Sequence, residues 1–146
     1  MIKVLIAEDS VILADILEFF LESDGYEVCG VASTVDEAVA LADLHRPDIG
    51  IFDFRLADGG SGTDIPRRMK DSTGLGVLYA TGNEMGDEMR DAQGIAYIQK
   101  PYTKKDVLDA LKIVSSISAR GEAAPRVLPI NFHLLANPVV GKRLLA

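Results

Sequence analysis

Five side chains suited to phosphate chemistry follow short apolar runs of the sequence. Glu8 and Asp9 come directly after the first run, and Asp53 follows the third. Thr81 follows the fourth run and Lys100 the fifth. If each run is a strand of one parallel sheet, the carboxyl ends of the strands meet at one edge, where open α/β sheets bind their ligands. We therefore expect three carboxylates, a hydroxyl group and an ammonium group to lie close together.

This combination of groups predicts a particular chemistry. Neighbouring carboxylates repel one another unless a cation lies between them. Oxygen ligands without a nearby His or Cys favour Mg²⁺, which keeps several waters and prefers a phosphate as co-ligand. Lys100 would face phosphate oxygens as a point charge, and Thr81 could donate a hydrogen bond to one. A carboxylate beside Mg²⁺ and opposite an ammonium group can act as a nucleophile toward phosphorus.

The elements that must position these residues alternate along the chain. Apolar, β-branched runs predict strands over about residues 2–7, 27–32, 48–52, 75–80 and 95–98. Helical spacing of apolar residues predicts helices after Ser10, after Ser33 or Thr34, from about Thr63 to Lys70, and after Thr103. A weaker helix, interrupted by Gly86, is expected over residues 84–91. Strands and helices in alternation predict an α/β fold with a parallel sheet covered by helices on both faces.

The order of these motifs resembles the receiver domain of two-component response regulators. The resemblance rests on Glu8-Asp9, Asp53, Thr81 and Lys100-Pro101, each at a strand end, and it covers about residues 1–119. Each motif alone is common, whereas their succession is specific. The resemblance implies a doubly wound, flavodoxin-like sheet of five parallel strands in the order 2-1-3-4-5. It also implies a cis peptide bond between Lys100 and Pro101.

The resemblance assigns roles to the acidic residues. Asp53 resembles the phosphoacceptor, which takes a phosphoryl group from the phosphohistidine of a histidine kinase or a histidine phosphotransfer protein. Asp9 resembles the direct Mg²⁺ ligand, and Glu8 resembles the outer ligand that holds a coordinated water. Asp53 itself and the backbone carbonyl of Arg55 would complete the protein ligands of the metal.

Three further residues resemble the parts of the family's switch. Thr81 resembles the switch hydroxyl, Tyr97 the switch aromatic, and Lys100 the lysine that pairs with the phosphoryl group. The run Tyr79-Ala80-Thr81-Gly82 is similar to the signature of an atypical single-domain subgroup, the "FAT GUY" type. In that subgroup the fourth helix is remodelled or missing, and the interval between Thr81 and Tyr97 is correspondingly short here.

Composition limits the class of protein. The chain has 146 residues, 48% of them hydrophobic, and a formal net charge of −7, which argues against nucleic acid or an anionic membrane surface as the partner. The single cysteine, Cys29, cannot form an internal disulfide, and no apolar run approaches the length of a membrane span. We therefore expect a cytoplasmic protein.

Residues 120–146 differ from the rest and are expected to form a C-terminal extension, which we call the arm. Apolar residues alternate with polar residues or proline at Leu128, Ile130, Phe132 and Leu134. This period of two predicts an extended strand. Pro129 restricts such a strand to a sheet edge. We expect the arm to dock on its own domain or on that of a second copy, giving a homodimer, unless it is a disordered tail. The arm is too short and has too many helix breakers to form a helix-turn-helix, so we expect no DNA-binding domain in it.

The sequence therefore predicts a single-domain response regulator, not an enzyme, that acts through contacts with a downstream protein. Two alternatives remain open. One is a pseudo-receiver that serves as an interaction module without being phosphorylated. The other is a hydrolase or phosphotransferase that turns over a small phosphorylated substrate with the same Asp–Mg²⁺ chemistry.

Overall fold

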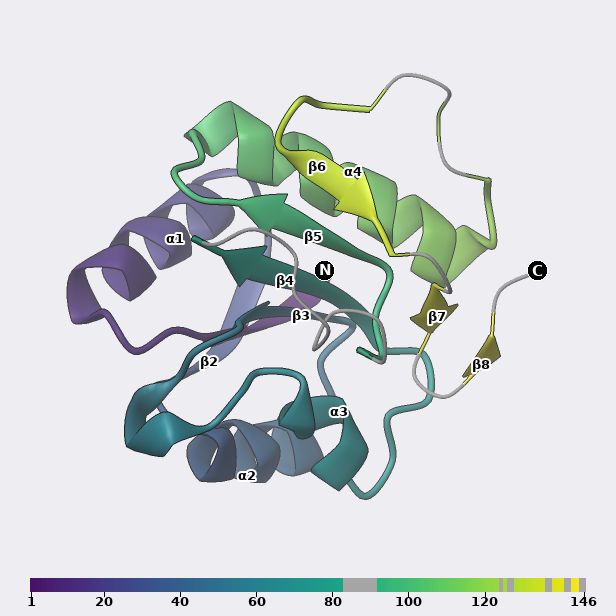
Figure 1. Ribbon diagram of the computed structural model, residues 1–146. Coiled ribbons are helices and arrows are strands. Elements are labelled where there is room, and N and C mark those ends of the chain that lie inside the picture. Colours follow the sequence, from purple (N-terminus) through teal and green to yellow (C-terminus); the bar gives the residue numbers. More distant parts are fainter. Residues whose placement is uncertain (83–91, 124, 126–127, 136–137, 141–142, 145–146) are drawn as a thin grey trace.

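The fold is a twisted sheet between two layers of helices (Figure 1). The structure is a computed structural model that describes residues 1–82, 92–123, 125, 128–135, 138–140 and 143–144. The strands of the sheet lie in the order β2-β1-β3-β4-β5-β6. Their bounds are Lys3–Ala7 (β1), Glu27–Ala32 (β2), Ile49–Asp53 (β3), Gly76–Thr81 (β4), Ala96–Gln99 (β5) and Phe132–Leu134 (β6). Pairing from β2 to β5 is parallel throughout, which confirms the predicted 2-1-3-4-5 arrangement.

Local signals in the sequence set where the helices begin. The helices are Val11–Ser23 (α1), Val35–His45 (α2), Asp64–Arg68 (α3) and Lys104–Arg120 (α4), and a 3₁₀ turn covers Ala57–Gly59 (η1). The side chains of Ser10, Thr34 and Thr103 each accept a hydrogen bond from a backbone N–H of the first turn, as N-caps do. Thr103 and Asp106 form a complete capping box at the start of α4.

The third helix is shorter than the predicted 63–70. It ends at Arg68 because Met69 adopts an extended conformation. Met69 is buried, with 5% of its surface exposed. The weak helix predicted over residues 84–91 lies outside the described residues. Among the residues that are described, no helix combines the length and the apolar composition needed to cross a membrane.

Apolar side chains fill both faces of the sheet, so the structure has two cores. The first core lies between the sheet and helices α1 and α4, and the second lies between the sheet and helices α2 and α3. Strands β1, β3 and β4 are buried on both faces, which explains why their sequences read as continuous apolar runs rather than as an alternating pattern. This double burial holds the carboxyl ends of the strands at fixed positions.

The arm contributes a sixth strand. β6 pairs antiparallel with β5, with Tyr97 opposite His133, so the arm docks on its own domain at a sheet edge. The strand is shorter than the alternation predicted. Pro129 and Phe132 close a turn through a backbone hydrogen bond of 3.0 Å, and Ile130 at this turn is 93% exposed instead of facing a core. Farther along, Val139–Val140 (β7) pairs with Arg143–Leu144 (β8) in a two-stranded ladder.

Candidate phosphoacceptor site

The predicted site residues gather at the carboxyl edge of the sheet. Glu8 follows β1 directly, Asp53 is the last residue of β3, and Thr81 is the last residue of β4. Lys100 follows β5 and precedes a cis peptide bond to Pro101, as the resemblance implied. The parallel topology brings these separate chain positions together, which is the arrangement that the strand-end pattern predicted.

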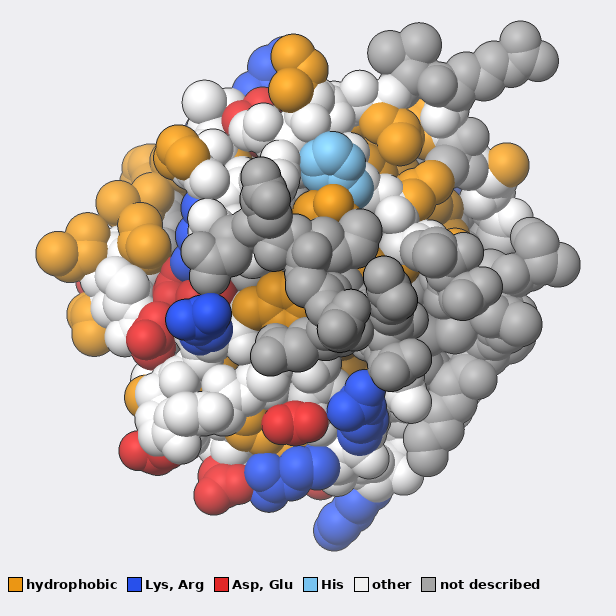
Figure 2. All heavy atoms as spheres, in the orientation of Figure 1, with side chains coloured by type: hydrophobic (Ala, Val, Ile, Leu, Met, Phe, Trp, Pro, Cys, Tyr) orange, Lys and Arg blue, Asp and Glu red, His pale blue; other side chains and the backbone are white. Residues whose placement is uncertain are grey.

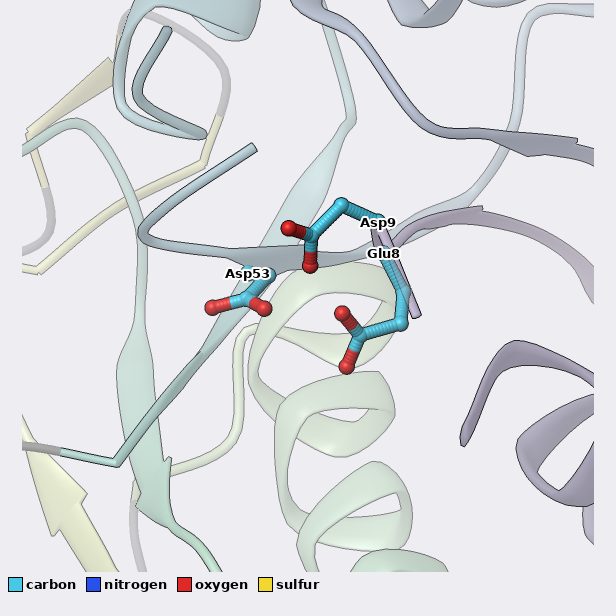
Figure 3. A group of neighbouring side chains, drawn as sticks. All are labelled: Glu8, Asp9 and Asp53. Atoms are coloured by element: carbon cyan, nitrogen blue, oxygen red, sulfur yellow. The ribbon is translucent and has the colours of Figure 1, made fainter. Parts of the chain in front are cut away.

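Three carboxylates converge on one point. Oxygen atoms of Glu8, Asp9 and Asp53 all lie within 4.8 Å of one another, and the three side chains point into the same space (Figure 3). Glu8 is 6% exposed and Asp53 is 9% exposed, whereas Asp9 faces solvent. The hydrogen bond between Asp9 and Glu8, partial burial and the negative charge of Glu8 together raise the pKa of Asp9 above its usual value. Glu8 therefore makes ionisation of its neighbour Asp9 less favourable.

Lys100 neutralises part of this charge. Its Nζ donates hydrogen bonds to Glu8 Oε1 at 2.6 Å and to Asp53 Oδ2 at 3.0 Å. Burial would lower the pKa of Lys100, but the hydrogen bonds and charges of Glu8 and Asp53 outweigh burial, and its pKa is raised. Lys100 is therefore a fixed cation whose ammonium group touches the predicted phosphoacceptor.

Backbone groups orient the two buried carboxylates. Ser10 N–H donates to Glu8 Oε2 at 3.2 Å, and Arg55 N–H donates to Asp53 Oδ1 at 3.3 Å. The chain after Asp53 turns back closely on itself. The approach is so close that a Cβ atom at Gly62 would lie only 2.2 Å from the Asp53 carbonyl oxygen. The glycine-rich loop thus allows this return, and Asp53 keeps its place at the end of the strand.

The two predicted switch residues occupy different surroundings. Thr81 is buried, and its carbonyl accepts a 2.8 Å hydrogen bond from Lys100 N–H, so it lies beside the cluster. Tyr97 is 5% exposed and belongs to the second core, where its ring stacks on the imidazole of His133 at a centroid distance of 4.8 Å. His133 did not emerge from the sequence as a functional residue. The alternating pattern of the arm predicted a strand, but not which residue of it would meet Tyr97.

The donor set fits a hard divalent cation. The ligand atoms are all carboxylate oxygens, one of the carboxylates is open to solvent, and Lys100 Nζ already supplies positive charge between the two buried ones. Mg²⁺ usually keeps several of its own waters when it binds to carboxylates, and the solvent-exposed side chain of Asp9 is accessible to such waters. The structure therefore supports Glu8, Asp9 and Asp53 as the residues that could hold this ion.

An apolar surface borders the site. Val11, Ile12 and Phe19 of α1 are 72%, 73% and 68% exposed, and hydrophobic side chains gather over this helix at the left of Figure 2. A groove of about 380 Å³ runs between α1 and the segment after β5, and Lys100 is among its lining residues. The rest of its lining is Leu13, Ile16, Leu17, Phe20, Pro101 and Tyr102. Exposed apolar patches of this kind typically mark interaction sites.

The fold and the site together define a doubly wound protein with an acidic, lysine-paired cluster at the carboxyl edge of its sheet. Residues 4–112 match the response regulator receiver domain family, and the chain belongs to this family. Proteins of this family are in general signalling modules rather than enzymes, and receiver domains bind Mg²⁺ in an acidic pocket.

Similar proteins support the same assignment. Over 117 residues the chain is 32% identical to the transcriptional regulatory protein PdtaR of Mycobacterium tuberculosis, an alignment that covers 78% of this chain and 57% of that protein. The chain spans little more than half the length of the curated relatives it matches.

Solved structures show the same fold. A CheY-like receiver domain protein from Methanospirillum hungatei has a TM-score of 0.73 and 25% identity, covering 84% of this chain and 99% of that one. The receiver domain of the sensor histidine kinase PA1611 from Pseudomonas aeruginosa, with a magnesium ion coordinated in its active-site cleft, has a TM-score of 0.64 and 23% identity. That alignment covers 77% of this chain and 93% of the other.

Proposed function

We propose that the chain is a phosphoacceptor response regulator that receives a phosphoryl group on Asp53 and switches protein contacts in response. The contact between Lys100 Nζ and Asp53 Oδ2 carries this proposal. A cation fixed at 3.0 Å from one carboxylate oxygen, within a cluster of acids, places positive charge where phosphoryl oxygens would arrive. A carboxylate that only caps a loop accepts hydrogen bonds from backbone N–H groups and does not require a half-buried lysine beside it.

The transfer would proceed by attack of an Asp53 carboxylate oxygen on phosphorus. The phosphorus–nitrogen bond of a phosphohistidine breaks, an oxygen–phosphorus bond forms, and the departing imidazole keeps the electron pair and takes up a proton. Lys100 would pair with the transferred phosphoryl group, and the Thr81 hydroxyl would donate a hydrogen bond to one of its oxygens. Tyr97 is proposed to respond to the movement of Thr81.

Mg²⁺ is proposed to bind to the carboxylates of Glu8, Asp9 and Asp53 and to the backbone carbonyl of Arg55. The bound ion would neutralise charge that builds up on the phosphoryl oxygens. The hydrogen bond to Glu8, partial burial and the negative charge of Glu8 raise the pKa of Asp9, so ionised Asp9 and Glu8 repel each other. Metal and phosphoryl binding are therefore expected to relieve the same repulsion.

The phosphodonor is proposed to be a histidine kinase or a histidine phosphotransfer protein that docks on α1. The exposed apolar side chains of this helix and the groove that reaches Lys100 offer a surface for an apolar helix face, next to the lysine that contacts Asp53. The negative charge of the chain fits protein partners in the cytoplasm better than nucleic acid or a membrane. The downstream target is proposed to be a protein.

Intact mass measurement tests the central claim. The protein is incubated with phosphoramidate and Mg²⁺, and the wild type is expected to gain one phosphoryl group while Asp53→Asn gains none. Asparagine keeps the shape of the side chain and removes its nucleophilic charge. An equal gain in the variant would show that the phosphoacceptor lies elsewhere, and no gain in the wild type would favour a pseudo-receiver. Steady release of phosphate from added phosphate esters would favour a hydrolase.

A further inference from the structure

The arm closes the free edge of β5 through its backbone. The two strands pair over three residues each, with Ala96 opposite Leu134, Tyr97 opposite His133 and Ile98 opposite Phe132. Two backbone hydrogen bonds of 3.0 Å extend this pairing at its ends. In one, Gln99 N–H donates to the Asn131 carbonyl, and in the other Leu135 N–H donates to the Ile95 carbonyl. Figure 1 shows β6 lying along β5 at the edge of the sheet.

The side chains of the arm are packed into the domain and do not merely lie on its surface. Phe132 is 2% exposed and belongs to the first core, whereas Leu135 is 5% exposed and belongs to the second. Val140 adds a third buried side chain, at 3% exposure. The arm therefore contributes to both faces of the sheet, so that its position and that of β5 depend on each other.

Asn131 connects the arm to both residues that flank Lys100. Its carbonyl accepts the hydrogen bond from Gln99 N–H, and its Nδ2 donates to the Pro101 carbonyl at 3.4 Å. The same Nδ2 donates to Asp106 Oδ2 at 3.2 Å, in the first turn of α4. The backbone on each side of Lys100 is thus tied to one residue of the arm.

His133 adds a side-chain connection two residues later. Its ring stacks on Tyr97 with an interplanar angle of 19°, and its Nε2 lies 3.3 Å from Gln99 Oε1. Stacked aromatic pairs stabilise a fold beyond the area they bury. His133 therefore holds the ring of Tyr97 in its buried position and, through Gln99, contacts the residue next to Lys100.

From these contacts we propose that the C-terminal arm is a positioning element of the phosphoryl site, so that its docking on β5 and phosphorylation of Asp53 favour each other. The inference rests on the proposed phosphoacceptor function. Lys100 must keep its ammonium group beside Asp53 to pair with an incoming phosphoryl group, and the docked arm restrains the chain on both sides of it. A site that is already ordered pays less conformational entropy when it binds. Because coupling is reciprocal, phosphorylation should in turn hold the arm more firmly.

Variants of His133 test the proposal through the initial rate of phosphorylation by phosphoramidate with Mg²⁺. His133→Ala removes both the stack and the Gln99 contact, and we expect its rate to fall about fivefold, equivalent to about 1 kcal/mol of activation free energy. His133→Phe keeps an aromatic ring against Tyr97 and should recover part of the rate. Ile130→Ser is the matched control, because Ile130 lies in the arm but is 93% exposed, and it should react like the wild type.

A folded His133→Ala protein that reacts at the wild-type rate would overturn the inference and leave the proposed function intact. A wild type that gains no phosphoryl group would overturn the proposed function and this inference with it. If His133→Ala does not fold, the test is amide hydrogen exchange in the wild-type protein, measured by NMR before and after phosphorylation. Phosphorylation should slow exchange at Gln99 and Leu135 about fivefold, and unchanged exchange at both amides would refute the coupling.

Discussion

Phe132 gives the sharpest test of whether the arm is part of the folded domain. Its side chain is 2% exposed and fills the first core from the edge strand β6. Truncation of a buried phenylalanine to alanine removes its transfer free energy and leaves a cavity, at a cost of about 3–5 kcal/mol. Since an edge strand can relax more than a central one, we expect Phe132→Ala to lose about 3 kcal/mol of the free energy of unfolding.

Urea denaturation and calorimetry measure this loss. For a chain of this size, each kcal/mol lowers the melting temperature by about 2–4 °C, so a decrease of roughly 10 °C is expected. Ile130→Ala serves as the control, because Ile130 lies two residues earlier and is 93% exposed, and its free energy of unfolding should change by less than about 0.5 kcal/mol. A loss below about 1 kcal/mol for Phe132→Ala, with an unchanged urea slope, would show that the arm is not packed into the core and would refute the reasoning.

Three further predictions concern the site and its border. Lys100→Met leaves Glu8 and Asp53 without their cation and should cost about 1–3 kcal/mol, less than for a fully buried pair because the Lys100 side chain is 21% exposed. Added Mg²⁺ should restore much of this loss in urea denaturation, and equal stability of the variant and the wild type without Mg²⁺ would contradict it. The raised pKa of Asp9 means that the folded state holds this proton to a higher pH than the unfolded chain, so its contribution to stability is present at low pH and is lost as pH rises through the folded pKa. Without Mg²⁺, Asp9→Asn should therefore be the more stable protein near neutral pH and resemble the wild type in acid, and a constant difference in stability across pH would disprove this assignment. Phe19→Ser should slow phosphotransfer from a phosphohistidine protein while phosphorylation by phosphoramidate continues at the wild-type rate, and equal slowing of both reactions would rule out α1 as the docking surface.

The sequence predicted the central strands, most of the helix starts and the gathering of polar residues at the strand ends. Helix starts at Ser10, Thr34 and Thr103 are local events, because a side-chain oxygen accepts a hydrogen bond from an N–H only three residues later. Apolar runs determine buried parallel strands, and a parallel sheet must bring their carboxyl ends to one edge. The convergence of Asp53 and Lys100 could therefore be predicted without coordinates.

Tertiary structure decided which partner each pattern meets. Helix α1 carries apolar residues on two sides, and only packing against the sheet decided that Leu17 and Leu21 are buried while Ile12 and Phe19 face solvent. A period of two predicts a strand but not its neighbour, because an unpaired edge offers the same N–H and C=O groups to any extended segment. The stack of His133 on Tyr97 depends on the register of β6 against β5. That register is set by where Phe132 and Leu135 fit into the two cores, which no local pattern in the sequence specifies.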